Sequence, residues 1–242
     1  GIRVRRGLLE DEARELNIGF VSRHERGRPW MRVKLAVSLD GFTASADGRS
    51  QWITGPEARA DGHRWRARAS AILTGIGTVL ADNPRLDVRC DSVERQPQRI
   101  VADSRARLPA DARMLTTGGP IRVASTRESP WQDKQVSWQQ LPATEDGRVD
   151  LPALVRWLGD LELNEVHVEA GPTLAGALMA AGLVDELLVY QAPVLLGKGA
   201  PMLEMPGMEN FDQRLHLQII DERRLGADTR YLLRPNSGAT SF

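Results

Sequence analysis

Residues able to do chemistry concentrate in one stretch of the sequence, between Lys34 and Arg89. Lys34 interrupts an apolar run with strand character, and Arg66, Asp82 and Arg89 follow it among several glycines. Guanidinium groups bind phosphate in bidentate fashion, and a strand lysine beside a cleft can donate to a carbonyl or phosphate oxygen. Glycines let the backbone approach a ligand closely while charges converge on it. The stretch is therefore interpreted as part of a ligand cleft.

Each of these residues also has a structural interpretation, which the sequence leaves open. A lysine on an edge strand discourages aggregation, and a single arginine in an arginine-rich chain commonly belongs to a solvated surface. The segment GTVLAD is interpreted as a turn. Its Thr78 and Asp82 either hold ribose or amide groups or, in the case of Asp82, cap the turn. Trp52 is either a core residue or a flat surface on which a heterocycle stacks.

A second candidate region begins at Glu165, where the run EVHVE passes through a glycine turn into the helical pattern AGPTLAGALMAAGL. The unpaired N–H groups at such a helix start favour phosphate. The pattern lacks the glycine pair of a Rossmann fingerprint and the ending of a Walker A loop, so dinucleotide binding and close helix–sheet packing through Gly176 both stay open. Glu169, at the carboxyl end of the strand, either handles hydrogen bonds and protons of a ligand or forms a structural ion pair.

Composition excludes several classes of function. The 242 residues include 32 basic and 32 acidic side chains, so the net charge of +0 offers no overall field that attracts nucleic acid or an anionic membrane. A single cysteine, Cys90, excludes an internal disulfide and a cysteine-based zinc cluster, and a cytoplasmic location is expected. His63 and His167 lack metal-ligand spacing and are interpreted as structural or surface residues. The longest weakly polar run, from Ala71 to Ala81, is shorter than the roughly 20 residues that cross a bilayer.

Three units are expected along the chain. Residues 1–29 combine a short amphipathic helix, LLEDEARELNIGF, with the polar stretch SRHERGRP, which is interpreted as a linker. Residues 30–236 alternate between β-rich runs and helical patterns, and residues 237–242 form a tail. Around Gly226, two β-like runs indicate a terminal antiparallel hairpin. One main α/β domain with a mixed sheet is therefore predicted.

Strands and helices within the main unit follow from periodicity and turn signals. The capping-box pattern TGPE, with its early proline, predicts a helix from Pro56 to Ala69, and LPALVRWLGDLEL predicts another helix. The predicted strands cover residues 33–38, 71–74, 98–103, 121–125, 165–169 and 185–196.

Several segments taken together resemble one family, the reductase half of the bifunctional riboflavin-biosynthesis deaminase/reductase. They are KLAVSLDG, SQWITGPEAR, ILTGIGTVLADNPRLDVR, VADS, VEAGPTLAGAL and GLVDELLVYQAPVLLG, which follow one another between Met31 and about Gly197. Residues 1–28 look like the end of the deaminase half. The deaminase signature, H-x-E followed by P-C-x-x-C, is missing, so neither deamination nor a metal site is expected in this chain. A zinc deaminase domain fused upstream in the full-length protein is compatible with the resemblance.

The resemblance implies a dihydrofolate-reductase-like α/β fold, with a mixed, mostly parallel central sheet, helices on both faces and a C-terminal antiparallel hairpin. It also implies NADPH-dependent reduction of 5-amino-6-(5-phosphoribosylamino)uracil to its ribitylamino product. On the cofactor side, the implied residues are Ala36, Trp52, Thr78, Asp82, Ser104, Gly171, Pro172, Thr173, Leu174, Ala175, Gly176 and Ala177. On the substrate side, they are Ser50, Arg66, Leu86, Arg89 and Glu169.

These assignments lead to a hypothesis in which hydride passes from NADPH to C1 of the ribosyl group. The predicted catalytic residues are Lys34, Asp82 and Glu169. Lys34 and Glu169 share base recognition and proton transfer, in an order that the sequence does not assign. Arg66 and Arg89 are predicted to hold the phosphate of the substrate.

Two other functions stay open: a pterin-type reductase of the same fold, and a nucleotide-binding module without turnover. The expected partner is the phosphorylated ribosylaminopyrimidine, with neither nucleic acid nor membrane. A homodimer is also expected, through the terminal hairpin and the apolar run from Leu187 to Leu196.

Overall fold

The computed structural model describes residues 4, 7–90, 93, 95–130, 136–207 and 210–236, so the predicted tail at 237–242 lies outside the described residues. A nine-stranded sheet forms the centre of the protein. Its strands are β1 (Trp30–Val37), β3 (Ala71–Gly75), β4 (Gln98–Ala102), β5 (Ile121–Ser125), β6 (Val136–Gln140), β7 (Glu165–Val168), β8 (Glu186–Gln191), β10 (Leu217–Leu225) and β11 (Asp228–Pro235). A small second sheet pairs β2 (Phe42–Ser45) with β9 (Gly199–Pro201).

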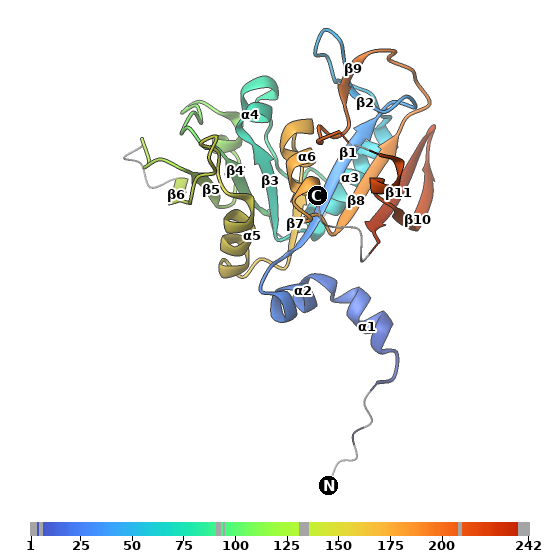
Figure 1. Cartoon of the computed structure of the whole chain (residues 1–242), viewed down its shortest axis with the longest axis horizontal. Helices are drawn as coiled ribbons and strands as arrows, with labels where there is room; N and C mark the ends of the chain where they lie inside the picture. Colours follow the sequence, from blue (N-terminus) through green and yellow to red (C-terminus); the bar gives the residue numbers. More distant parts are fainter. Residues whose placement is uncertain are drawn as a thin grey trace.

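Helices cover both faces of the large sheet (Figure 1). The helical elements are α1 (Glu10–Leu16), α2 (Ile18–Arg26), α3 (Pro56–Arg68), α4 (Ile76–Asp82), η1 (Arg113–Thr116), α5 (Leu151–Asp160), α6 (Pro172–Ala180) and η2 (Phe211–Gln213). The strand order is β10-β11-β8-β1-β7-β3-β4-β5-β6. All pairs from β8 to β6 are parallel, whereas β11 pairs antiparallel with β8 and β10. The predicted α/β architecture, with a mostly parallel sheet and a C-terminal hairpin, is confirmed.

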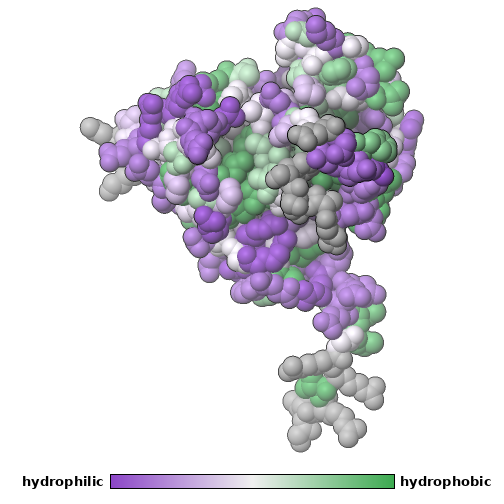
Figure 2. Space-filling view, in the orientation of Figure 1, coloured by the Kyte–Doolittle hydropathy of each residue, from purple (hydrophilic) through white to green (hydrophobic). Residues whose placement is uncertain are grey.

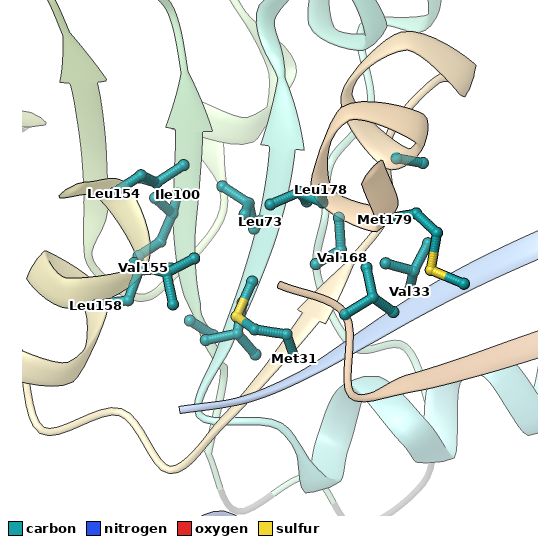
Figure 3. Close-up of a cluster of buried hydrophobic side chains, with 14 of the residues drawn as sticks. Met31, Val33, Leu73, Ile100, Leu154, Val155, Leu158, Val168, Leu178 and Met179 are labelled. Carbon is teal, nitrogen blue, oxygen red and sulfur yellow. The ribbon is translucent and has the colours of Figure 1, made fainter. Parts of the chain in front are cut away.

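The main hydrophobic core lies between one face of the sheet and helices α5 and α6 (Figure 3). Alternate residues of the strands point to this face, as the two-residue period of a strand requires. Met31 and Val33 come from β1, and they meet Leu178 of α6 and other fully buried aliphatic side chains. Each such side chain stabilises the fold by about 1.5–3 kcal/mol relative to an exposed one.

The other face of the central strands carries charge. Arg32 and Lys34 alternate with the core residues of β1, and Glu165 and His167 do the same on β7. Arg32 is only 2% exposed, and its guanidinium bonds the carboxylates of Glu186 and, at 2.8 Å, Glu165. Helix α3 packs over this face. Because buried charges require paired partners, this layer fixes how the helix and the strands fit together.

The start of α3 differs from the predicted capping box. Gly55 is the residue before the helix, and no side chain within the local pattern caps it. Instead, Asp228 at the turn of the terminal hairpin accepts the Gly55 N–H at 2.6 Å. The helix itself runs from Pro56 to Arg68, close to the predicted range. A contact between distant parts of the chain thus replaces the local cap and ties the hairpin to α3.

Two other local predictions are wrong. The segment GTVLAD is helical as part of α4, because Ile76 and Val79 lie one turn apart and are both buried. The strand predicted over 185–196 ends at Gln191. Pro193 lacks a backbone N–H for a sheet ladder, and the N–H groups of Leu196 and Gly197 bond to the Asp40 carboxylate. Strands β2, β6 and β9 were not predicted.

The stretch interpreted as a linker is largely helical and bonded to the main unit. Residues 22–26 belong to α2, and the guanidinium groups of Arg26 and Arg28 both donate to Asp185 at 2.7–2.8 Å. On α1, Glu15 pairs with Arg234 of β11. Apolar side chains remain exposed on these two helices (Figure 2), among them Leu16 and Phe20.

In the described part of the chain, no helix combines the length and apolar character that crossing a bilayer demands. Among the same residues, no group of three or more histidine, cysteine, aspartate or glutamate side chains is arranged to hold a metal ion.

Gly176 and Gly62 offer a test of the packing of α6, because both are mid-helix glycines. A Cβ at Gly176 would lie 2.0 Å from the backbone carbonyl oxygen of Glu204, whereas a Cβ at Gly62 meets nothing within 4 Å. Gly176→Ala is expected to lower the free energy of unfolding by about 1–3 kcal/mol, as overpacking does. Gly62→Ala should raise it by about 0.5–1 kcal/mol through helix propensity. Urea denaturation measures both, and equal stabilisation by the two substitutions would contradict the packing described.

Candidate active site

A cleft of about 1370 Å³ opens at the carboxyl-terminal ends of β1, β3, β4 and β7. The connection that leaves β1 runs through α3 on one face of the sheet to β3, whereas the connection that leaves the neighbouring strand β7 runs through α6 on the other face to β8. Open α/β sheets bind ligands at such a switch point. The cleft exceeds the roughly 300–1,000 Å³ of a site for one small molecule, so it has room for two ligands side by side.

Most of the residues proposed from the sequence line this cleft. They are Lys34, Ala36, Ser50, Trp52, Arg66, Thr78, Asp82, Leu86, Arg89, Ser104, Glu169, Gly171, Pro172, Thr173, Leu174 and Ala177. Ala175 and Gly176, which the resemblance places on the cofactor side, do not line it. Ala175 is fully buried in the main core, and Gly176 faces the backbone of Glu204. The packing interpretation of Gly176 is therefore the one the geometry supports.

Arg66 and Glu169 form the centre of the site. Arg66 projects from α3, and Glu169 follows the last residue of β7. The guanidinium bonds both carboxylate oxygens, with Nη2 at 2.6 Å from Oε2 and Nε on Oε1. Arg66 Nη1 also donates to the backbone carbonyl of Asp87 at 2.9 Å. Three of the five guanidinium N–H donors are therefore engaged within the protein.

His167 lies directly behind this pair. It is fully buried on β7, and its Nε2 is 3.3 Å from Oε1 of Glu169. Burial alone would raise the pKa of Glu169, but the charge and hydrogen bonds of Arg66, together with His167, hold this pKa well below its usual range. Glu169 is therefore an ionised hydrogen-bond acceptor at neutral pH, and it has no proton to donate.

Lys34 faces the same pair from β1. Its Nζ lies 5.7 Å from the centre of the Tyr190 ring, and the Tyr190 hydroxyl donates to Asp61 at 2.8 Å. Burial has the largest effect on the pKa of Lys34 and lowers it. The charge of Glu169 raises this pKa and the charge of Arg66 lowers it, so the net shift of the pKa is downward. A lysine with a lowered pKa releases its proton more readily than an exposed one. Of these two residues, Lys34 carries N–H groups, whereas the ionised Glu169 can only accept hydrogen bonds.

Arg89 belongs to a group that the sequence reasoning identified only in part. Arg85, Asp87 and Arg89 alternate along the segment after α4, which turns at Leu86, where φ is 51°. The buried Asp87 carboxylate bonds both arginines. Both arginines line the cleft. The alternation R-x-D-x-R is a signal in the sequence, because oppositely charged side chains two residues apart can pair with one another.

His63 of α3 packs against Arg89, although it was interpreted only as a structural or surface residue. Its Nδ1 accepts the Arg89 backbone N–H at 3.2 Å, and Arg89 Nη2 lies 3.3 Å from its Nε2. Burial, with the charges of Arg66 and Arg89, lowers the pKa of His63 to about 4. A neutral imidazole therefore contacts the arginine.

Thr78, Ser104, Trp52 and Asp82 lie at separate points of the cleft. Thr78 Oγ1 accepts the Gly171 N–H at 3.1 Å and so joins α4 to the start of α6. Ser104 Oγ accepts the Val149 N–H at 2.9 Å. The Trp52 ring is 69% exposed, with the Arg59 guanidinium 4.7 Å from its centre. Asp82 ends α4 on the exposed rim.

The far end of the cleft fits a phosphorylated dinucleotide. The first turn of α6 opens on the cleft at Thr173 and Leu174, where a helix leaves N–H groups without intrahelical acceptors and so suits a pyrophosphate. Beyond Ser104, four exposed arginines line the same cleft and supply charge for a further phosphate. They are Arg105, Arg107, Arg113 and Arg148.

Comparison with known proteins gives a consistent family. Residues 29–231 match the family described as the RibD C-terminal domain. The chain is 43% identical over 241 residues to the riboflavin biosynthesis protein RibD of Escherichia coli, covering 94% of this chain and 66% of that protein. For RibD of Haemophilus influenzae the identity is 36% over 248 residues, covering 97% and 66%. The chain thus spans about two thirds of the length of the curated relatives it matches.

Solved structures agree with this match. Form 1 of Acinetobacter baumannii RibD superposes with a TM-score of 0.85 at 36% identity, covering 96% of this chain and 65% of that chain. A Thermotoga maritima protein named as a diaminohydroxyphosphoribosylaminopyrimidine deaminase/5-amino-6-(5-phosphoribosylamino)uracil reductase gives 0.86 at 25% identity, covering 97% and 64%. The resemblance inferred from the motifs, and the mixed, mostly parallel α/β sheet that it implied, are confirmed.

The buried position of His63 predicts a pH dependence of stability. Its pKa in the folded protein, about 4, is below the unfolded value, so acidification from about pH 6.5 protonates the unfolded chain first. The free energy of unfolding should therefore fall between pH 6.5 and 4, by roughly 1–2 kcal/mol after allowance for solvent screening. Denaturant titrations should show a smaller fall in His63→Gln. The control substitution His216→Gln, at an exposed residue, should retain the wild-type fall, and identical pH profiles for all three proteins would refute the assignment.

Proposed function

The chain belongs to the RibD C-terminal domain family, and from this we propose that it uses NADPH to reduce 5-amino-6-(5-phosphoribosylamino)uracil to the ribitylamino product. The observation that carries the proposal is the meeting of Lys34, Arg66 and Glu169 in a cleft of about 1370 Å³ with cationic groups at both ends. Such a cleft suits a phosphorylated substrate beside a phosphorylated cofactor.

The proposed reaction requires one hydride and one proton. Ring opening of the ribosylamine moves the amine proton to the ring oxygen and leaves an imine. Bound NADPH supplies the hydride that C1 of this imine receives. The electron pair of the C=N bond then moves to nitrogen, which takes up one proton. The protein therefore has to hold C1 in line with the nicotinamide of the cofactor, deliver one proton to the nitrogen, and keep other reactants away from the imine.

Lys34 is the proposed proton donor to that nitrogen. Its lowered pKa favours release of the proton, and the adjacent Glu169 is held ionised by Arg66. Glu169 is then the acceptor for N–H groups of the aminopyrimidine. The order of the two roles, which the sequence left unassigned, follows from the opposite electrostatic environments of an amine and a carboxylate.

The roles of the arginines divide differently from the sequence-based hypothesis. Arg66 was expected to hold phosphate, yet its Nε and Nη2 edge is occupied by Glu169. Its main role in this proposal is to hold Glu169 ionised and in place. Arg89 is the proposed phosphate ligand, with Ser50 and Leu86 also lining the substrate side of the cleft.

The cofactor side is proposed to run from Thr78 and Asp82 to the start of α6 and on to Ser104. The arginines beyond Ser104 suit the 2′-phosphate that distinguishes NADPH from NADH. Trp52 and Ala36 complete the part of the cleft where the nicotinamide would meet the substrate.

A pterin-type reductase and a binding module without turnover are the alternatives. A pterin has no phosphate for the cationic group around Arg89, which favours the phosphorylated substrate. A module without turnover would have no need of the buried Lys34 beside an ionised carboxylate.

The length match to about two thirds of each relative also supports a deaminase domain fused in the full-length protein. A homodimer through the terminal hairpin, where Ile219 and Ile220 of the edge strand are exposed, remains a prediction.

Deuterium transfer tests the proposed activity directly. With NADPH deuterated on the transferring face of nicotinamide C4, mass spectrometry should find one deuterium at C1 of the ribityl chain. Oxidation of NADPH by a pterin but not by the ribosylaminouracil phosphate would support the first alternative. Binding of NADPH without any oxidation would support the second.

Substitution of Lys34 and Glu169 should separate their roles. Lys34→Ala is expected to slow single-turnover reduction by about 10²–10⁴-fold, as loss of a general acid does. Glu169→Gln should mainly weaken substrate binding, and it should also lower stability because Arg66 loses its buried partner. Stopped-flow kinetics on folded variants measure the rates, with Arg224→Gln on the exposed edge strand as a control. A wild-type rate in Lys34→Ala would eliminate this lysine as proton donor.

Arg89→Ala should impair recognition of the phosphate more than turnover. Loss of a charge-assisted contact costs about 1.5–3 kcal/mol, so KM for the phosphorylated substrate should rise by about 10–100-fold. KM for an analogue without the phosphate should hardly change. Steady-state kinetics with the two substrates measure the difference, and equal losses on both would remove Arg89 from the phosphate site.

A further inference from the structure

The segment after α4 holds an acidic residue between two arginines of the cleft. The side chains of Arg85 and Arg89 are 45% and 49% exposed, whereas that of the intervening Asp87 is 7% exposed. Asp87 Oδ1 accepts from Arg89 Nη1 at 2.5 Å, and Oδ2 accepts from Arg85 Nε at 2.9 Å. One buried carboxylate thus holds two cations that both line the cleft.

The backbone of this segment is anchored on both sides. The side-chain amide of Gln96 accepts the Val88 N–H at 2.8 Å and donates to the Val88 carbonyl at 3.0 Å. It thus satisfies both backbone groups of Val88, as the backbone of a neighbouring strand would. The carbonyl of Asp87 accepts from Arg66, and the N–H of Arg89 donates to His63. Leu86 is 3% exposed and anchors the chain in the second hydrophobic cluster. The two arginines therefore start from a fixed backbone.

Asp87 has an electrostatic cost for an anion site. Burial would raise the pKa of Asp87, but hydrogen bonds and charges of Arg89 and Arg85 lower it, so the carboxylate is ionised. An ionised carboxylate repels a phosphate that binds to the same arginines. Asp87 also has a compensating effect, because it holds two long side chains in place before the phosphate binds. A flexible arginine loses rotamer entropy when it binds, whereas an arginine already held by a carboxylate loses less.

We propose that Asp87 is a positioning residue that holds Arg85 and Arg89 as a paired clamp for the phosphate of the substrate, and that Arg85 is a further phosphate-binding residue. The inference rests on the proposed function for the identity of the substrate. The clamp itself is a site for a sugar phosphate.

The charge of the assembled site suits a phosphate. Arg66, Arg85 and Arg89 face Asp87 and Glu169, so these five groups carry one net positive charge before any contribution from Lys34. A phosphate anion is attracted to a site with this excess of positive charge. Donors also remain: Arg89 gives Asp87 one Nη1 proton and Arg85 gives it its Nε edge, so each guanidinium has N–H groups left for oxygen acceptors.

Asp87→Asn distinguishes positioning from simple electrostatics by the sign of the effect. Removing a negative charge near the phosphate would tighten binding if Asp87 only contributed charge. Loss of the clamp should instead weaken binding, and KM for the phosphorylated substrate should rise by about tenfold or more, with kcat changing by less than about threefold. KM for the analogue without phosphate should stay at the wild-type value.

Arg85→Gln is the second variant, because its half-exposed side chain can be replaced without disturbing the core. It should weaken phosphate binding to a similar extent. The matched controls are Arg224→Gln and Asp160→Asn, at exposed positions outside the cleft. Thermal unfolding checks that each variant is folded.

Calorimetric binding of ribose 5-phosphate gives a readout that does not depend on catalysis. The wild type and both controls should bind this probe, and Asp87→Asn and Arg85→Gln should bind it about tenfold more weakly or not at all. Tighter binding by Asp87→Asn, or wild-type binding by Arg85→Gln, would overturn the clamp while leaving the reductase proposal intact. A different outcome is that the wild type binds the probe but does not reduce the ribosylaminouracil phosphate. If both variants then lose binding of the probe, the clamp is supported and the proposed function is rejected.

Discussion

The ion pair between Arg66 and Glu169 is the interaction on which the arrangement of the site depends. It joins a helix on one face of the sheet to the carboxyl end of a central strand, with both carboxylate oxygens bonded to one guanidinium. Each side chain is only 16% exposed, so removal of either partner would leave a charge with little water around it, at a typical cost of about 3–5 kcal/mol. The pair sets the state of its neighbours. It keeps Glu169 ionised, and its arginine also reaches the segment that carries Arg89.

The two faces of the sheet explain why such a pair can exist. One face buries aliphatic side chains against α5 and α6 and supplies the hydrophobic stabilisation. The other face holds a row of paired charges that continues from the site to the N-terminal helices. Arg32 bonds Glu186 and Glu165, and Arg234 links Glu186 to Glu15 of α1. The arginines and carboxylates of this layer are tolerated because they pair with one another. Lys34 lies in the same layer, with its Nζ 5.7 Å from the centre of the Tyr190 ring.

Convergence of the main site residues could be predicted from the sequence, because it follows from local rules. Strand alternation puts Lys34 opposite the core side of β1, and the carboxyl-end rule puts Glu169 at the ligand edge. Other features depend on packing between distant segments, which periodicity does not encode. The phase of α6 turns Ala175 and Gly176 away from the cleft because the Glu204 backbone packs against Gly176. The cap of α3 comes from Asp228, 173 residues further along the chain. The ionisation of Glu169 likewise depends on an arginine 103 residues away.

The central claim is that Arg66 holds Glu169 as an ionised acceptor and leaves proton donation to Lys34. A ¹³C NMR titration of the glutamate carboxyl groups tests it most directly, with the Glu169 signal assigned by its loss in Glu169→Gln. The account predicts that this signal keeps the chemical shift of a carboxylate through the pH range in which exposed glutamates titrate, as long as the protein is folded. A Glu169 signal that titrates together with the exposed glutamates, or that shows a protonated carboxyl near neutral pH, would contradict it.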